Sequence, residues 1–211
     1  MVKRANKRDR ENNPKRERKV ILIAVEGGNK TERNYFVELN RRQGEYHINF
    51  ADGNSTDPAN VVEDAINSAL NKGIDYLKGD KVYAVLDTDF GKEKQIEDAR
   101  RRANRENVEM ILSNPCFEIW LLQHFRYSTG GYNSGSEVLK ELTEFWPGYR
   151  KNLDSFQDLY DKTELAIKNS NDLIKFHDSV NQRAELEYRN PSTDVYKLMQ
   201  LIILGYDDTK E

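Results

Sequence analysis

Residues 19–28 read KVILIAVEGG, an apolar run that ends in an acid and two glycines. The run is rich in β-branched side chains and shows no alternation, a pattern typical of a strand buried on both faces. The residues after the glycines take on helical spacing through Tyr35, Phe36 and Leu39. This stretch therefore predicts a strand, a tight turn and a helix, the opening unit of an α/β fold.

The same alternation of strand and helix continues to about residue 113. Further strands are predicted at 46–50 (YHINF), 81–87 (KVYAVLD) and 108–113 (VEMILS). Asp57 and Pro58 open a helix that Gly73 ends, and a polar helix follows the third strand. Four strands and three helices predict a four-stranded, mainly parallel sheet flanked by helices.

After Pro115 the pattern predicts helices only, with a loop rich in Gly, Ser and Tyr after the first of them. Three segments follow from this division of the chain. We expect a basic arm over 1–18 that is disordered when free, an α/β core over 19–125, and an all-helical extension over 126–211 packed on that core. No segment has the composition of a linker between independent domains.

The charge of the chain is unevenly distributed. The formal net charge is -3, yet residues 1–19 hold nine Lys and Arg against three Asp and Glu. A sequence pI of about 5.8 would normally argue against a nucleic-acid partner, but the basic arm weakens that argument. If nucleic acid binds, the arm and the basic stripe of Arg100, Arg101, Arg102 and Arg105 are the best candidates for phosphate contacts.

Cysteine content and hydropathy indicate a soluble protein. Cys116 is the single cysteine, which excludes an intramolecular disulfide and a Cys-rich zinc site. No apolar run reaches the roughly 20 residues that span a bilayer, and no export signal precedes the first strand. We expect a cytoplasmic protein with no membrane partner; its oligomeric state is left open.

Acidic residues follow three of the predicted strands. Glu26 ends the first strand, Asp87 and Asp89 end the third, and Glu118 follows the fourth in the first turn of a helix. Carboxyl ends of parallel strands meet at one edge, where ligands bind. Clustered carboxylates repel one another unless a cation neutralises them, and oxygen ligands favour Mg²⁺ or Mn²⁺. The pattern predicts a metal site formed by Glu26, Asp87 and Asp89.

Each of these residues also has an ordinary structural interpretation. Asp87 and Asp89 are common strand-exit residues, and Glu26 could simply end its strand. Glu32 fits a capping box, which we favour over catalysis, and Glu118 equally fits a helix dipole interaction. Lys92 and Lys94 resemble ordinary exposed lysines at a helix start. His47, His124 and His177 join no constellation, and Ser192 or Thr193 is predicted to cap the last helix.

Four motifs resemble a known family. VEGGNKTERNYF, VLDTDF, SNPCFEIWLLQHF and NPSTDVYKL, in this order, are similar to the RloB-like (AbiLii-type) proteins of bacterial defence loci. The resemblance implies a Toprim-like core in which Glu26, Asp87 and Asp89 hold Mg²⁺. It also implies a nuclease-like protein of an anti-phage, abortive-infection system that acts beside a partner ATPase encoded nearby.

The first functional hypothesis is therefore a Mg²⁺-dependent nuclease that hydrolyses phosphodiester bonds in DNA or RNA, with Glu118 as a fourth ligand or as the group that orients water. One alternative is a non-catalytic regulatory subunit that binds the partner ATPase. Another is a nucleotidyl transferase that uses the same acidic site. The residues do not separate DNA from RNA, endonuclease from exonuclease, or one metal from two.

Overall fold

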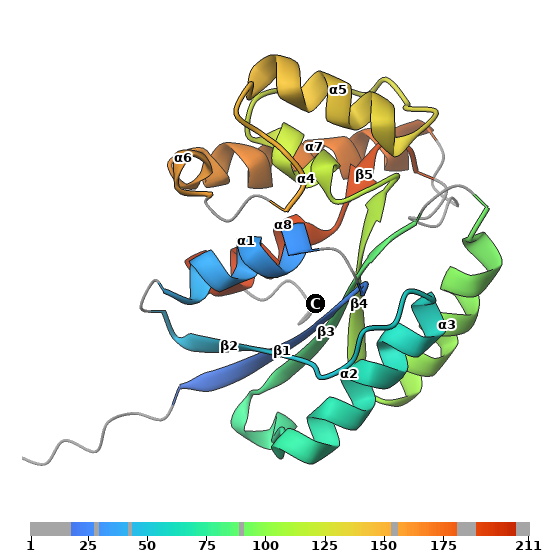
Figure 1. Cartoon of the computed structure of the whole chain (residues 1–211), viewed down its shortest axis with the longest axis vertical. Helices are drawn as coiled ribbons and strands as arrows, with labels where there is room; N and C mark the ends of the chain where they lie inside the picture. Colours follow the sequence, from blue (N-terminus) through green and yellow to red (C-terminus); the bar gives the residue numbers. More distant parts are fainter. Residues whose placement is uncertain are drawn as a thin grey trace, which may run out of the picture.

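The computed structural model describes residues 18–27, 30–41, 44–88, 91–152, 156–180 and 189–205. Within them the chain forms one twisted sheet with helices on both faces (Figure 1). The strands are β1 (Lys19–Val25), β2 (Tyr46–Phe50), β3 (Lys81–Asp87), β4 (Val108–Asn114) and β5 (Ser192–Thr193). Their order is β2-β1-β3-β4-β5; neighbours among the first four pair in parallel, and β5 runs antiparallel to β4.

The predicted four-strand count is wrong, because the described residues form five strands. Ser192 and Thr193 pair with the end of β4, and the amide of Asp194 donates to the carbonyl of Leu112 at 2.7 Å. A strand of two residues is too short to show any alternation in the sequence. The predicted extension is consequently not all-helical, since it supplies an edge strand to the sheet.

Eight α-helices lie in the described part of the chain. They are α1 (Lys30–Asn40), α2 (Pro58–Lys72), α3 (Glu93–Arg105), α4 (Glu118–Gln123), α5 (Gly135–Phe145), α6 (Gln157–Tyr160), α7 (Thr163–Val180) and α8 (Val195–Met199). A 3₁₀ turn (Tyr76–Lys78) precedes β3, and a π-helical segment (Gln200–Leu204) follows α8.

The helices α2 and α3 cover one face of the sheet (Figure 1). The predicted start and end of α2 are confirmed: Asp57 accepts hydrogen bonds from the amides of Ala59 and Asn60, and Gly73 ends the helix at φ 66°. The core of this face consists of aliphatic side chains and alanines from β1, β3, β4, α2 and α3.

The other face of the sheet carries two helical layers. The helices α1 and α8 lie directly on the strands, and α4, α5 and α7 lie beyond them (Figure 1). A second core joins both layers to β1 and β3, and it is rich in aromatic residues: Tyr35, Phe36, Phe117, Trp120, Tyr149 and Phe156. The helices of the predicted extension therefore share one core with the strands.

The proposed segment boundaries stay predictions. Residues 1–17 of the basic arm lie outside the described residues. Among the residues that are described, no helix is both long enough and apolar enough to cross a membrane.

Candidate functional site

The carboxyl ends of β1, β3 and β4 bring the predicted acids to one edge of the sheet. Glu26 follows β1 directly, Asp87 is the last residue of β3, and Ser113 of β4 is the register partner of Asp87. Asp89 lies outside the described residues, so its place beside Asp87 stays a prediction. The structure therefore places two of the three predicted metal ligands at neighbouring strand ends.

Glu26 is paired with a cation from the next unit of the chain. The Lys92 ammonium, just before α3, donates to Glu26 Oε1 at 3.2 Å. The two side chains are 28% and 12% exposed. We predicted Lys92 to be an ordinary surface lysine, and this is wrong; Lys94, two residues on, is indeed exposed. Sequence reasoning missed the pair because the partners are 66 positions apart.

Glu118 is buried at the start of α4. Its side chain is 4% exposed, and the Tyr149 hydroxyl donates to Glu118 Oε1 at 2.9 Å. Burial and the nearby charge of Glu118 raise the pKa of Tyr149, so the phenol stays protonated and remains a donor. Tyr149 lies in the loop after α5, where no sequence pattern indicated a role. Glu118 is therefore a buried carboxylate with a hydrogen-bond partner, and its role in the site stays a prediction.

Glu32, in the first turn of α1, is the acid whose environment is most unusual. It is 4% exposed, and burial raises its pKa to about 7. The charges of Glu118 and Glu26 contribute to this increase in the pKa, whereas a backbone hydrogen bond and Lys151 oppose it. Glu32 Oε2 has no hydrogen-bond partner among the described residues. Asn29 of the predicted capping box lies outside them, so that prediction is untested.

The charges of Asp87 and Glu118 also act on the buried Cys116. Burial, followed by the charges of these two acids, raises the pKa of the Cys116 thiol well above its usual value. The charges of Glu26 and Glu118 therefore act on Glu32, and those of Asp87 and Glu118 act on Cys116. This convergence of negative charge is the defining electrostatic property of the edge.

A hard divalent cation fits this edge in charge and donor chemistry. Carboxylate oxygens are its preferred ligands, and the buried Glu32 Oε2 has no hydrogen-bond partner among the described residues. In the described ranges, however, no three His, Cys, Asp or Glu side chains lie close enough together to hold one ion. The complete ligand set, with Asp89, stays a prediction.

A cavity of about 350 Å³ opens beside Glu26, between the ends of β1 and β2. Arg33 lines it, with its guanidinium 4.5 Å from the centre of the Phe50 ring. Gly27 also lines the cavity. A side chain at this position would clash with the carbonyl oxygen of Asn54. Close approach of two loops, rather than a positive φ, therefore requires this glycine.

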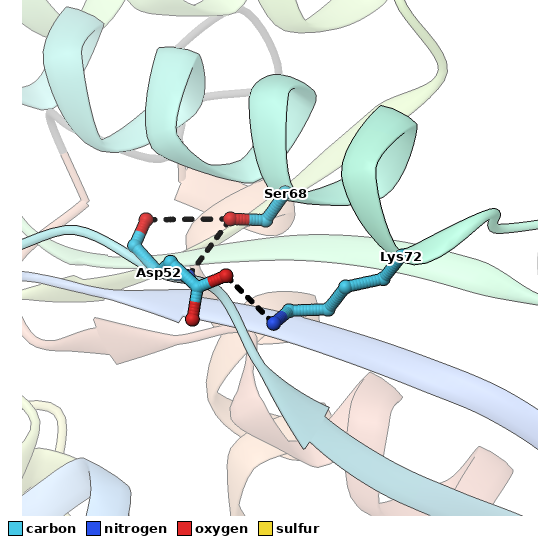
Figure 2. Close-up of polar contacts among 3 residues, drawn as sticks. All are labelled: Asp52, Ser68 and Lys72. Carbon is cyan, nitrogen blue, oxygen red and sulfur yellow. Dashed lines mark hydrogen bonds and ion pairs between the residues drawn. The ribbon is translucent and has the colours of Figure 1, made fainter.

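Asp52, which follows β2, also lines the cavity, and its contacts with Ser68 and Lys72 are drawn in Figure 2. Its amide donates to Ser68 Oγ at 2.8 Å, and its carboxylate accepts from the Lys72 ammonium at 2.7 Å. Both partners come from α2. A larger cavity of about 650 Å³ lies at the amino ends of the strands, away from Glu26 and Asp87.

The basic stripe on α3 is engaged within the protein. Arg101 pairs with Glu97 and Asp98, and Arg102 pairs with Glu63 of α2. These contacts agree with a solvated helix face, and they leave the proposed phosphate contacts untested.

The histidines stay outside the acidic edge. His124 is fully buried and its Nδ1 hydrogen bonds to the carbonyl of Trp120 at 3.0 Å, which confirms a core residue. His177 Nε2 hydrogen bonds to the carbonyl of Pro191 at 2.7 Å. The prediction that Ser192 or Thr193 caps the last helix is met only in part: both belong to β5 and Asp194 directly precedes α8, but the Val195 amide, the first of α8, donates to Thr193 Oγ1 at 3.3 Å.

Thr193 nevertheless lies near the acidic edge. Its hydroxyl hydrogen bonds to that of Ser113 at 2.9 Å, and Ser113 is in register with Asp87. The late NPSTD motif thus borders the carboxyl end of β4, at the same end of the sheet as Asp87.

Comparison with curated proteins found no match, and comparison with solved structures found none either. Comparison with protein families found one, to a family described as RloB-like protein, over residues 21–202. The match includes β1 from Ile21 onward, the other four strands, and the acids Glu26, Asp87 and Glu118. Because it covers most of the chain, the chain belongs to the RloB-like protein family.

Proposed function

We propose that the protein is a Mg²⁺-dependent nuclease that hydrolyses phosphodiester bonds in DNA or RNA. The observation that carries the proposal is the convergence of Glu26, Asp87 and Glu118 at the carboxyl edge of a mainly parallel sheet. Such edges are where α/β folds bind ligands. The Toprim-like assignment of the core belongs to this proposal and draws on the same arrangement.

The acids have different roles in this proposal. Glu26 and Asp87, with Asp89, would hold the metal, which when bound polarises a phosphoryl oxygen and makes bound water easier to deprotonate. Glu118 is fixed by the Tyr149 hydroxyl and orients the attacking water. Glu32, with a pKa of about 7, can hold or release a proton beside Glu118 near neutral pH.

The cavity beside Glu26 supports a nucleotide as substrate. Its volume of about 350 Å³ offers space for a small ligand, and Arg33 supplies a cation suited to a phosphate group. A defence role in abortive infection, and action beside an ATPase encoded nearby, remain part of the proposal and rest on the family resemblance.

The test is metal-dependent cleavage by the full chain. Purified protein, alone and with the neighbouring ATPase, is incubated with single-stranded DNA, duplex DNA and RNA in Mg²⁺, Mn²⁺ or a chelator. We expect Asp87→Asn to lower the cleavage rate by about 100-fold or more. Asp98→Asn is the matched control, because Asp98 lies on α3 and pairs with Arg101. Cleavage that survives Asp87→Asn would reject the assignment.

The ion pair at Glu26 favours a second candidate, a regulatory subunit without catalysis. In that case Lys92 would permanently neutralise Glu26, and the acidic edge would serve binding alone. This candidate predicts a stable complex with the ATPase and no cleavage of any of the three substrates.

A further inference from the structure

The Lys92–Glu26 pair joins two parts of the chain that both belong to the acidic edge. Glu26 follows β1, whereas Lys92 lies between the end of β3 and the start of α3. The ammonium is 3.2 Å from Glu26 Oε1, and the carboxylate side chain is only 12% exposed. A charge-assisted hydrogen bond to a carboxylate with so little exposure restrains the Glu26 side chain.

The position of Lys92 suits two anionic partners. Its compact charge sits on a flexible stem of four methylene groups, which allows the ammonium to move without rearranging the backbone. The side chain is 28% exposed, so part of it already faces solvent. Lysine also binds phosphate as a point charge. A single side chain can therefore neutralise either Glu26 or an approaching phosphate.

We propose that Lys92 is a resident cation that holds the Glu26 carboxylate in place before metal binds, and that its ammonium turns to the substrate phosphate once a divalent cation has replaced it. This inference rests on the proposed metal-dependent function. In this proposal Lys92 competes with the metal for the Glu26 carboxylate, and it also contributes to cleavage by binding the substrate phosphate.

The two roles of Lys92 predict that one substitution raises the affinity for metal and lowers the cleavage rate. Removing the charge of Lys92 removes the cation that competes for Glu26, so divalent metal binds more tightly, by about two- to fivefold for an ion pair of this exposure. The same change removes a positive charge from the phosphate, so the cleavage rate at saturating metal falls by at least about tenfold. A purely structural role would weaken metal binding and cleavage together.

The experiment measures Mn²⁺ binding separately from cleavage. Mn²⁺ affinity of the full chain is measured by electron paramagnetic resonance without nucleic acid, for the wild type, Lys92→Met, Lys92→Arg and Glu26→Gln. Lys94→Met is the matched control, because Lys94 is an exposed lysine two residues along the same segment. Circular dichroism and melting temperature verify that each variant is folded, and cleavage is assayed at saturating Mn²⁺.

We expect Lys92→Met to bind Mn²⁺ more tightly and to cleave more slowly, Lys92→Arg to stay closer to the wild type in both, and Lys94→Met to change neither. Unchanged or weaker Mn²⁺ binding by folded Lys92→Met, when binding still requires Glu26, would overturn this inference and leave the proposed function intact. Absence of Mn²⁺ binding to the wild type, or binding that Glu26→Gln does not reduce, would overturn both.

Discussion

The two faces of the sheet are packed with different kinds of side chain. The face under α2 and α3 is packed with valine, leucine, isoleucine and alanine. The face under α1 and α8 is packed with large aromatic rings and also buries ionisable or polar groups, among them Glu32, Glu118, His124 and Asn169. One face therefore derives its stability mainly from apolar burial, whereas the other also encloses ionisable groups.

The two faces therefore have different roles: one stabilises the sheet, and the other positions ionisable groups. Burying a carboxylate costs free energy unless it is paired or neutralised, so a fold retains such groups only where something offsets the cost. The α2 and α3 face holds the strands in register, and the opposite face positions Glu32 and Glu118 beside the strand ends. Substitutions on the two faces should accordingly differ in kind as well as in size.

The largest effect is expected in the aromatic core. Trp120 is fully buried and makes edge contacts with Tyr35 and His124 at ring distances of 6.3 and 4.8 Å. Trp120→Ala should lower the free energy of unfolding by about 4 kcal/mol, as truncation of a buried aromatic does. Urea unfolding measures it, with the partly buried Trp146→Ala as the milder comparison. A loss below about 1 kcal/mol would contradict the packing described for this face.

The next effect is a pH dependence carried by Glu32. Its pKa is raised from 4.5 to about 7, so the folded protein holds a proton that the unfolded chain has released. The free energy of unfolding should therefore fall as the pH rises from about 4.5 to 7, by roughly 3 kcal/mol, and level off above that window.

Comparison with Glu32→Gln isolates this dependence. His124 acts in the opposite direction, because burial lowers its pKa from 6.5 to about 4 and stability is lost as the pH falls through that range. Both proteins share the His124 contribution, so it cancels in their difference. If wild type and Glu32→Gln show parallel stability profiles between pH 4.5 and 7, the raised pKa of Glu32 is refuted.

A smaller effect is expected on the aliphatic face. Ala99 of α3 is fully buried against the sheet, and Ala99→Leu should destabilise the protein by about 2 kcal/mol through overpacking. Metal dependence of cleavage should stay as in the wild type, because this face contributes none of the acids. Gln95→Leu, at an exposed position of the same helix, is the control. A changed metal dependence in Ala99→Leu would break the separation between the two faces.

The smallest effect is expected at the surface of that face. Arg102 pairs with Glu63 across α2 and α3, and the side chains are 49% and 39% exposed. Arg102→Ala should lower the free energy of unfolding by about 0.5 kcal/mol or less, because solvent screens such pairs. Thermal unfolding at low and high salt measures this. A loss of several kcal/mol would mean that this face also depends on charge.

The sequence was most informative where one short segment determines the outcome. The strands at 19–25 and 81–87 and the ends of α2 were predictable from local patterns, and so was the placement of Glu26 and Asp87 at one edge. Contacts between distant segments were not predictable. Lys92 and Tyr149 meet their carboxylates across 66 and 31 positions, and β5 is visible only once it lies beside β4.

The return of the chain at β5 and α8 also bears on when the protein can fold during synthesis. The aliphatic core is complete once residue 112 has been made, since its last member is Leu112. The aromatic core still lacks Val195, Leu198 and Met199, which pack against α1, where the Tyr35 hydroxyl lies 3.8 Å from Met199 Sδ. A nascent chain can thus close one half of the molecule early, whereas the half that holds the buried acids waits until residues 195–199 have been made.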